Sequence, residues 1–208
     1  KGNGKFAFTM PGSKVTVKAA FTKNDDSCPR DNSCPLYGFS DLNVQAWYHD
    51  GIHYCLANGL MNGVGNELFA PEGTTTRAQL VTLLWRQAGS PEADFSMDFD
   101  DVAEGQWYSE AVRWAAGRGI VLGVSDTQFA PGQPITREQL TAMLYRYAQY
   151  EGADVDEDGK LSDYIDANSI SEYAVPAMQW ARGVGVINGT DGNRLDPRGT
   201  ATRAQAAA

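Results

Sequence analysis

Three arginines are candidate binding residues because each lies at the predicted start of a helix, where a positive charge is unfavourable. The sequence Thr-Arg-x-Gln occurs at residues 76–79, 136–139 and 202–205. A cation in the first helical turn faces the positive end of the helix dipole, at a cost of roughly 0.3–1 kcal/mol. Because this choice recurs at all three starts, we expect an anion at Arg77, Arg137 and Arg203.

The threonine and glutamine of the same motif position these arginines. In a capping box the Thr oxygen accepts from the backbone N–H three residues later, and the Gln side chain reaches back to the Thr N–H. Each copy follows a Phe/Leu-x-Pro turn and precedes an apolar run. The motif therefore predicts three helix starts, which need no ligand, and any functional claim rests on the arginine.

The motif belongs to a longer internal repeat with a period of about 60 residues. Phe39-Ser40-Asp41 resembles residues 99–101, and we align the third copy on residues 161–163. Each copy then has an aromatic residue, a predicted helix, a turn with glycine and the Thr-Arg motif. The aligned residues are Trp47, Trp107 and Tyr173, and the turn glycines are Gly63, Gly123 and Gly189.

The spacing of apolar residues in each copy is helical. Tyr48, Ile52, Cys55 and Leu56 follow i, i+4, i+7 and i+8, which indicates one buried face. Cys55 shares its position with alanines at 115 and 181, so we expect a small buried thiol. Neither helix of a unit can bury its face alone, and we expect three helix–loop–helix units to share one core.

These features together resemble the S-layer homology (SLH) family, present as three tandem repeats over residues 39–92, 93–154 and 155–208. The resemblance implies a mainly α fold, a pseudo-threefold bundle that binds secondary cell-wall polymers, often pyruvylated glycans, without catalysis. It implies that Arg77, Arg137 and Arg203 lie in grooves between repeats and meet the carboxylate of the ligand. It places Trp47 and Trp107 beside the sugar, with the backbone of Gly63, Gly123 and Gly189 as further candidate contacts.

The sequence departs from the family in two respects. The family usually has Glu where this chain has Gln79, Gln139 and Gln205, which removes three negative charges near the arginines. The third copy has Tyr173 in place of Trp and Leu195 in place of Phe, and its second helix stops at the end of the given sequence. We therefore expect the third groove to be the weakest, or its helix to be completed by further residues.

Structural alternatives exist for each candidate. The arginines could pair with Asp41, Asp101 or Asp163, or stack on an aromatic ring. Trp47 and Trp107, like Trp114 and Trp180, lie at helical spacing and could be core residues. The three glycines could simply provide positive φ at helix-ending turns.

The N-terminal segment differs from the repeats. Residues 1–23 predict a β-hairpin that resembles the end of a β-sandwich repeat of Gram-positive surface proteins, and residues 24–38 form a polar linker. Cys28 and Cys34 predict a local disulfide, with unpaired thiols or a pairing with Cys55 as alternatives. A zinc site needs about four ligands. Because His49 and His53 are the only histidines and have no counterpart in the other copies, we interpret them as a surface feature and expect no zinc.

One acidic stretch is a weak calcium candidate. Asp154, Asp156 and Asp158 match the first positions of an EF-hand loop, but the twelfth position is Ile165 where a bidentate Glu is needed. An acidic linker is the simpler interpretation. We therefore expect no metal and no cofactor.

The net charge and the lengths of the apolar runs exclude two classes of binding partner. The formal net charge of -9 argues against nucleic acid, and no apolar run reaches the roughly 18–20 residues that span a membrane. The sequence contains no Gly-x-Ser-x-Gly, His-Glu-x-x-His or phosphate-loop motif, and it opens without Met or a signal peptide. We expect a non-catalytic, extracellular module of a larger exported protein that binds cell-wall polysaccharide. The alternative is a protein–protein interaction module in surface-layer assembly.

Overall fold

The computed structural model describes residues 28–94, 96–97, 99–156 and 159–208, and this part of the chain is mainly helical. The predicted hairpin at residues 1–23 lies outside the described residues. None of the described helices is long and apolar enough to cross a membrane. The helices are η1 (Pro35–Gly38), α1 (His49–Ala57), α2 (Arg77–Gln87), α3 (Ser109–Gly117), α4 (Arg137–Tyr150), η2 (Ala167–Ser169), η3 (Glu172–Ala174), α5 (Val175–Gly183) and α6 (Arg203–Ala207).

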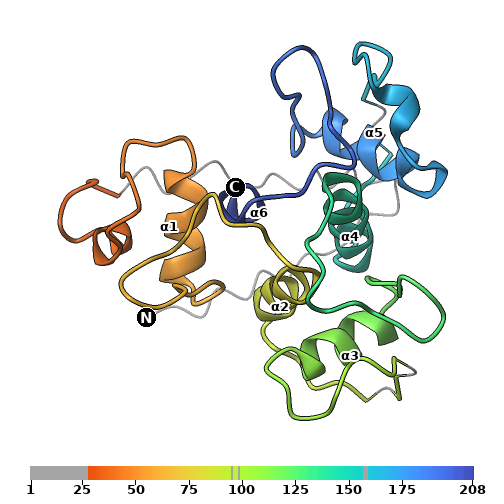
Figure 1. The fold of residues 1–208 in the computed structure, drawn as a ribbon, viewed down its shortest axis with the longest axis horizontal. Helices are drawn as coiled ribbons and strands as arrows, with labels where there is room; N and C mark the ends of the chain where they lie inside the picture. The colour runs from red at the N-terminus through yellow and green to blue at the C-terminus, as the bar shows by residue number, and fades with distance from the viewer. Residues whose placement is uncertain (1–27, 95, 98, 157–158) are drawn as a thin grey trace, which may run out of the picture.

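The helices pair between repeats. The second helix of repeat 1, α2, packs on α3 of repeat 2, and α4 packs on α5 of repeat 3. The series closes because α6 of repeat 3 packs on α1 of repeat 1, next to the C-terminus in Figure 1. Each repeat therefore supplies one helix to each of two lobes, and no repeat forms a lobe alone.

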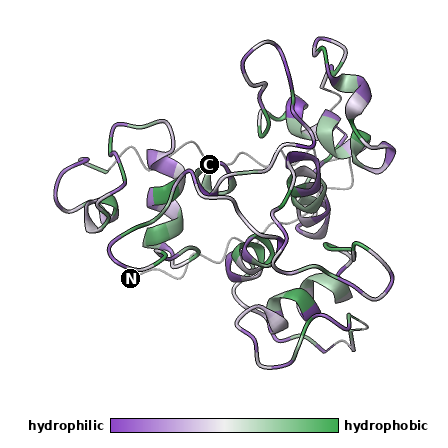
Figure 2. Cartoon of the chain, in the orientation of Figure 1, coloured by the Kyte–Doolittle hydropathy of each residue, from purple (hydrophilic) through white to green (hydrophobic). Residues whose placement is uncertain are grey.

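The buried side chains form three clusters, which corrects the expectation of one shared core. The cluster of the α2–α3 lobe contains Leu80 and Trp114, that of the α1 lobe contains Ile52 and Phe69, and that of the α4–α5 lobe contains Met178. Figure 2 shows hydrophobic residues on the paired helices. The α2–α3 cluster also reaches the centre of the molecule, because Ile135 of repeat 2 and Ala201 of repeat 3 belong to it. Leu83 and Leu144 pack against it and also against the α1 and α4–α5 clusters, respectively, so the three clusters adjoin one another.

The centre also holds a closed set of backbone hydrogen bonds between the strand-like segments before the capping boxes. Thr75 N donates to Ala201 O at 2.9 Å, Ala201 N donates to Ile135 O at 3.0 Å, and Ile135 N donates to Thr75 O at 2.8 Å. Each repeat thus donates to one neighbour and accepts from the other. The three segments are therefore bonded to one another in a ring, which links the three lobes.

The turns after the first helices correct one assignment of glycine. Positive φ occurs at Gly59 (67°), Gly119 (68°) and Gly185 (81°), which directly follow the helices, and not at the turn glycines expected to need it. Glycine is the residue that adopts this left-handed conformation without strain. Gly63 and its two counterparts therefore need another explanation.

Candidate functional site

All three predicted capping boxes are formed. The backbone N–H of Gln79 donates to Thr76 Oγ1 at 3.3 Å, and the Gln79 side chain accepts from Thr76 N at 2.9 Å. The same pair of hydrogen bonds occurs at the starts of α4 and α6. Gln therefore fulfils the capping role at all three helices, as expected.

The motif arginines join consecutive repeats. Arg77 of repeat 1 donates from Nε to Phe129 O at 2.7 Å and from NH2 to Leu122 O at 2.8 Å, both in repeat 2. Arg137 makes the same two bonds to repeat 3, at 2.8 Å to Leu195 O and 3.0 Å to Asn188 O.

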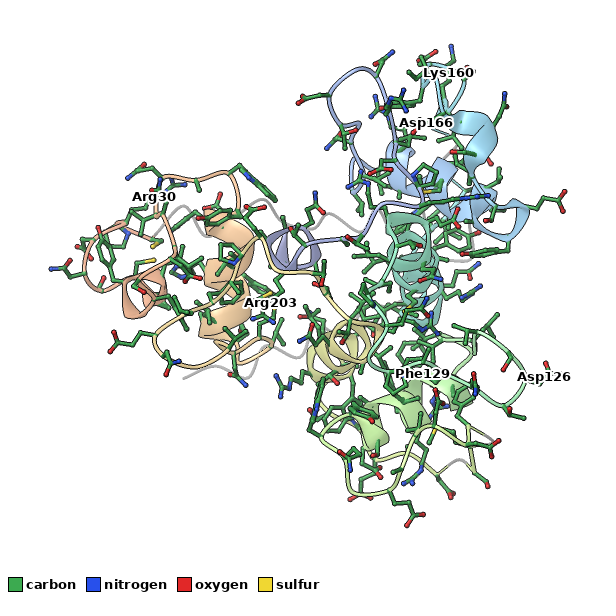
Figure 3. The ribbon with its side chains drawn as sticks, in the orientation of Figure 1. Arg30, Asp126, Phe129, Lys160, Asp166 and Arg203 are labelled. Carbon is green, nitrogen blue, oxygen red and sulfur yellow. The ribbon has the colours of Figure 1, made fainter. Side chains whose placement is uncertain are left out.

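Arg203 completes the series by returning to repeat 1. Its Nε donates to Phe69 O at 2.8 Å and its NH2 donates to Asn62 O at 2.7 Å. Figure 3 labels Arg203 and also Phe129, the partner of Arg77, and the two residues lie in different lobes. The equivalent arginine contacts are therefore far apart in the molecule. Each guanidinium therefore holds the Gly-turn and the Phe/Leu-x-Pro loop of the next repeat together.

Two of the arginines also stack on an aromatic ring. The guanidinium carbon of Arg77 lies 4.6 Å from the centroid of Phe129, and that of Arg203 lies 4.6 Å from the centroid of Phe69. Such contacts contribute about 0.5–2 kcal/mol, more where water is excluded. Arg137 meets Leu195 at this position, so the junction between repeats 2 and 3 lacks the cation–π contact.

These contacts answer why a cation stands at each helix start. The guanidinium extends away from its own helix to two carbonyl oxygens, whose partial negative charge offsets the unfavourable helix dipole. Burial lowers the pKa of Arg77, Arg137 and Arg203 from the usual value, with Asp101, Asp166 and Asp41 acting in the opposite direction. Arginine nevertheless stays protonated in proteins, so the buried charge persists.

The aspartates of the repeat openings do not form ion pairs with these arginines within the described part of the chain. Asp41 instead accepts the backbone N–H groups of Phe69 and Ala70, at 2.9 and 2.7 Å. Asp101 accepts those of Phe129 and Ala130 in the same way. Each aspartate therefore fixes the loop whose carbonyl the arginine binds from the other side.

The third repeat begins three residues later than the sequence alignment predicted. Asp166, not Asp163, accepts the backbone N–H groups of Leu195 and Asp196, both at 2.8 Å. Tyr164 correspondingly takes the place of the opening phenylalanine. The error arose because Leu-Ser-Asp imitates the motif, whereas only Tyr164-Ile165-Asp166 has the right distance to η2 and α5.

Close packing explains the three turn glycines. A Cβ on Gly123 would lie 2.8 Å from the Phe99 ring and 2.7 Å from Gln128 O, and one on Gly189 would lie 2.6 Å from the Tyr164 ring. Gly63 lies against the ring of Phe39 in the same way. These glycines leave room for the opening aromatic residue of their own repeat.

The tryptophans divide into two groups. Trp114 and Trp180 are buried, at 2% and 3% exposure, whereas Trp47 and Trp107 are 64% and 59% exposed. Each exposed indole packs edge-on against the tyrosine that follows it. The equivalent Tyr173 of repeat 3 is 52% exposed. An exposed ring held by a neighbouring ring is suited to stacking on a sugar.

Arg146 is a candidate that sequence reasoning missed. This arginine of α4 is partly buried and makes no hydrogen bond or ion pair with another residue that the structure describes. Burial lowers its pKa, and Tyr173 opposes that shift. Its helical position gave no signal because the equivalent Arg86 of α2 has an ordinary structural role, a hydrogen bond of 3.0 Å to Leu60 O.

Tyr173 lies within electrostatic reach of both Arg146 and the motif arginine Arg77. Burial raises the pKa of Tyr173, as does Glu138, to which its hydroxyl donates at 3.4 Å, while Arg146 and Arg77 act to lower it. Glu138 is itself held by Ser171, through its backbone N–H and its hydroxyl. Two guanidiniums, one exposed phenol and one carboxylate thus lie near each other.

The cysteines of the linker differ from the expected disulfide, because Cys28 and Cys34 carry free thiols. Both lie next to His49, which is 1% exposed and therefore not the surface residue expected. Cys55 is buried at 3% exposure, as expected from its alignment with alanine. Of the weak calcium candidates, Asp158 lies outside the described residues, and Asp154 and Asp156 are both exposed.

Comparison with known proteins agrees with these repeats. The family described as S-layer homology domain matches residues 39–81, 98–141 and 163–207, and its third match begins next to Tyr164. An amylopullulanase of Thermoanaerobacterium thermosulfurigenes is 31% identical over 82% of this chain, and the exoglucanase XynX of Acetivibrio thermocellus is 30% identical over 82%. The surface-layer 125 kDa protein of Lysinibacillus sphaericus is 30% identical over 79%.

The chain spans only 9%, 16% and 14% of the length of these three relatives. The shared part is therefore a module that occurs in proteins with different names. With three family matches and the same arginine contact at each repeat junction, the chain belongs to the S-layer homology domain family and carries three of its repeats.

Proposed function

We propose that this module anchors a larger exported protein to an anionic secondary cell-wall polymer, without catalysis. The module is extracellular, at the cell wall or surface layer, as are S-layer relatives such as that of Lysinibacillus sphaericus. The polymer carries an acidic group, such as the carboxylate of a pyruvylated sugar. The observation that carries this proposal is the unpaired guanidinium of Arg146 beside Tyr173 and Arg77.

Arg146 is the primary anion contact in this proposal. Arg77 already donates Nε and NH2 to two carbonyl oxygens and is only 3% exposed, so its main role is to join repeats. Arg146 has no such bonds among the described residues and would gain from a carboxylate. A charge-assisted hydrogen bond contributes about 1.5–3 kcal/mol, which would raise the affinity for an acidic sugar roughly 10- to 150-fold.

The motif arginines remain secondary contacts. Arginine has five N–H donors, and each motif arginine uses Nε and one NH2 hydrogen in the bonds above, which leaves the others for a ligand. Arg137 is more exposed than Arg77 and Arg203, and it lacks a stacked ring. Among the three, we therefore expect Arg137 to contribute most to binding directly.

Exposed aromatic rings provide the sugar-stacking surface. Trp47 and Trp107 occupy the positions equivalent to Tyr173, and both are more than half exposed. The backbone of Gly63, Gly123 and Gly189 is not needed in this proposal, because packing accounts for their missing side chains. Since the net charge of -9 opposes an anionic polymer at long range, binding is local and weakens with salt.

The pseudo-threefold arrangement is part of the same proposal. The support for it is the cycle of hydrogen bonds through Thr75, Ile135 and Ala201, and the cycle of arginine contacts from each repeat to the next. Such an arrangement would present three similar binding positions. Their ligand contacts differ because Glu138 and Arg146 are present in one of them.

The test is retention of the purified module on cell-wall sacculi, with Arg146→Gln compared with Arg118→Gln. Arg118 is an exposed arginine at the C-terminal cap of α3, so the control makes the same charge change. We expect Arg146→Gln to weaken binding about tenfold, the loss of roughly 1.5 kcal/mol. Equal retention of the two variants would contradict the assignment of Arg146.

Sacculi stripped of secondary polymer with hydrofluoric acid separate the polymer from a protein partner. Loss of binding after stripping supports the glycan. Undiminished binding would instead favour the interaction module in surface-layer assembly, or peptidoglycan itself.

A further inference from the structure

A cluster of four possible metal ligands lies beside the first helix of repeat 1, apart from the arginine contacts. Cys28 and Cys34 precede the repeat, and His49 and His53 lie one turn apart on α1. One ligand atom from each residue lies within 4.8 Å of all the others. Among the described residues, this is the group of His, Cys, Asp and Glu side chains close enough to hold a metal ion.

Three sulfur–nitrogen distances in the cluster match those of a tetrahedral metal site. Cys28 Sγ lies 3.6 Å from His49 Nε2, and Cys34 Sγ lies 3.5 Å both from His49 Nε2 and from His53 Nδ1. With Zn–S near 2.3 Å and Zn–N near 2.0–2.1 Å, tetrahedral S and N ligands are about 3.5 Å apart. The four side chains therefore need little movement to bind an ion placed between them.

Hydrogen bonding alone does not explain this convergence. His49 Nε2 has a single lone pair when the ring is neutral and bonded at Nδ1, so it cannot accept from both thiols at once. All four groups nevertheless approach one another, and two of them, Cys34 and His49, are buried. A cation between them would satisfy both sulfurs and both nitrogens.

Asp50 holds the His49 ring in the orientation that metal binding through Nε2 would require. Its Oδ1 lies 2.7 Å from His49 Nδ1, which leaves Nε2 to face the two sulfurs. Arg30, labelled in Figure 3, lies 3.3 Å from the same Oδ1 and belongs to the loop between the two cysteines. A carboxylate on the far nitrogen of a metal-bound histidine is a recurring second layer of zinc sites.

The other repeats show that these residues are not needed for the fold. Ser109 of repeat 2 takes the position of His49, and its hydroxyl holds the loop before α3 by accepting from Gln106 N and donating to Ala103 O. Arg113 takes the position of His53 and pairs with Glu110. Histidines at both positions occur only in the repeat that the cysteine loop contacts.

We propose that Cys28, Cys34, His49 and His53 bind one Zn²⁺ ion in a structural site. Two thiolates and two imidazoles in a tetrahedron suit zinc, and a full set of four protein ligands leaves no open position for catalysis. The two thiols release their protons to solvent as the metal binds. The ion fastens residues 28–38, whose Leu36 is already buried in the cluster of α1, to the first repeat.

The direct test is the zinc content of the reduced, purified 208-residue protein after equilibration with Zn²⁺ alone. We expect one zinc per chain, and on replacement by Co²⁺ the visible bands of a tetrahedral site with thiolate charge transfer. Cys28→Ser and His53→Gln each lose the metal or bind it at least about tenfold more weakly. Cys55→Ala is the matched control, because the other repeats carry alanine at this position, and it keeps one zinc per chain.

Asp50→Asn provides a variant that leaves all four ligands in place. We expect its zinc affinity to fall about 10- to 100-fold, the usual effect of losing such an outer partner. His53 is only partly buried, so His53→Gln can be checked for native circular dichroism to exclude unfolding. Wild-type protein without bound zinc, or unchanged zinc content in Cys28→Ser and His53→Gln, would overturn the proposal. So would a Cys28–Cys34 disulfide in the exported protein, seen as the loss of two hydrogens in the intact mass.

Discussion

Arg203 donates a hydrogen bond of 2.8 Å to the backbone carbonyl of Phe69, which lies 134 residues earlier in the chain. The same guanidinium stacks on the ring of Phe69. Through this contact the last helix of the chain holds the loop of the first repeat, and the three repeats close on themselves. The arginine that marks each repeat in the sequence therefore has a structural role that does not depend on any ligand.

Removal of Arg203 should destabilise the whole module. Arg203→Ala leaves two carbonyl oxygens without their donor and removes the ring contact. We expect the free energy of unfolding to fall by about 2–4 kcal/mol. Urea denaturation measures the change. The stability of Arg203→Lys should lie between those of wild type and Arg203→Ala, because one ammonium group cannot reproduce the two parallel hydrogen bonds of the planar guanidinium. Arg118→Ala is the control and should change stability by less than about 0.5 kcal/mol. A similarly small change for Arg203→Ala would show that the contact between Arg203 and the first repeat contributes little to the free energy of unfolding.

A methyl group on Gly123 should be costly, whereas one on the nearby Gly132 should not. The Cβ of Gly123→Ala would collide with the Phe99 ring and the backbone carbonyl of Gln128, and the packed loop must then move. We expect a loss of about 1–3 kcal/mol. Nothing lies within 4 Å of a Cβ on Gly132, which serves as the matched control. Thermal unfolding of the two variants compares them, and equal melting temperatures would refute the packing role of Gly123.

Alkaline pH should destabilise the protein through Cys55. Burial raises the pKa of this thiol to about 11. An unfolded cysteine titrates near pH 8.5, so the folded state holds the proton more tightly. The stabilising difference is fully present below about pH 8.5 and is lost as the pH rises toward 11, by an amount of about 3 kcal/mol. The free energies of unfolding of wild type and Cys55→Ala, measured between about pH 8.5 and 11, isolate the contribution of this thiol, since the two proteins share all other titrating groups. Parallel pH profiles would contradict it.

Two tryptophans should separate binding from stability. Trp107→Ala removes a ring that is 59% exposed, and we expect weaker retention on sacculi with a stability loss below about 1 kcal/mol. Trp114→Ala opens a cavity in the α2–α3 lobe and should cost about 3–5 kcal/mol. Sacculus pull-down and urea denaturation on both variants measure the two properties. Unchanged retention of Trp107→Ala would remove the exposed indole from the proposed sugar-binding surface.

The cysteine–histidine cluster shows how sequence interpretation can miss a site. His49 and His53 have the His-x3-His spacing of common zinc sites, but Cys28 and Cys34 are separated by five residues where two to four are usual. The loop between the cysteines favoured a disulfide when considered alone. Only the docking of this loop on α1 brings the sulfurs next to the two imidazoles.

The third repeat illustrates a different difficulty. Leu161-Ser162-Asp163 matches the opening motif in type and order, but the hydrogen bonds to the Leu195 loop come from Asp166. The opening motif is only three residues long and accepts Phe, Tyr or Leu at its first position, so a second match can occur by chance within a few residues. The loop that an aspartate binds, about 29 residues away, decides between such candidates, and this distance is not visible in the motif.

The sequence by itself determined the starts of α2, α4 and α6, the repeat order and the family. Capping boxes and helical spacing act within a few residues, where the chain leaves few alternatives, so local residue types are sufficient to predict them. The tertiary structure decided what the arginines bind, that the buried side chains form three adjoining clusters, and that two cysteines and two histidines meet. Those contacts join residues from 15 to 141 positions apart, and their geometry exists only once helices of different repeats have packed together.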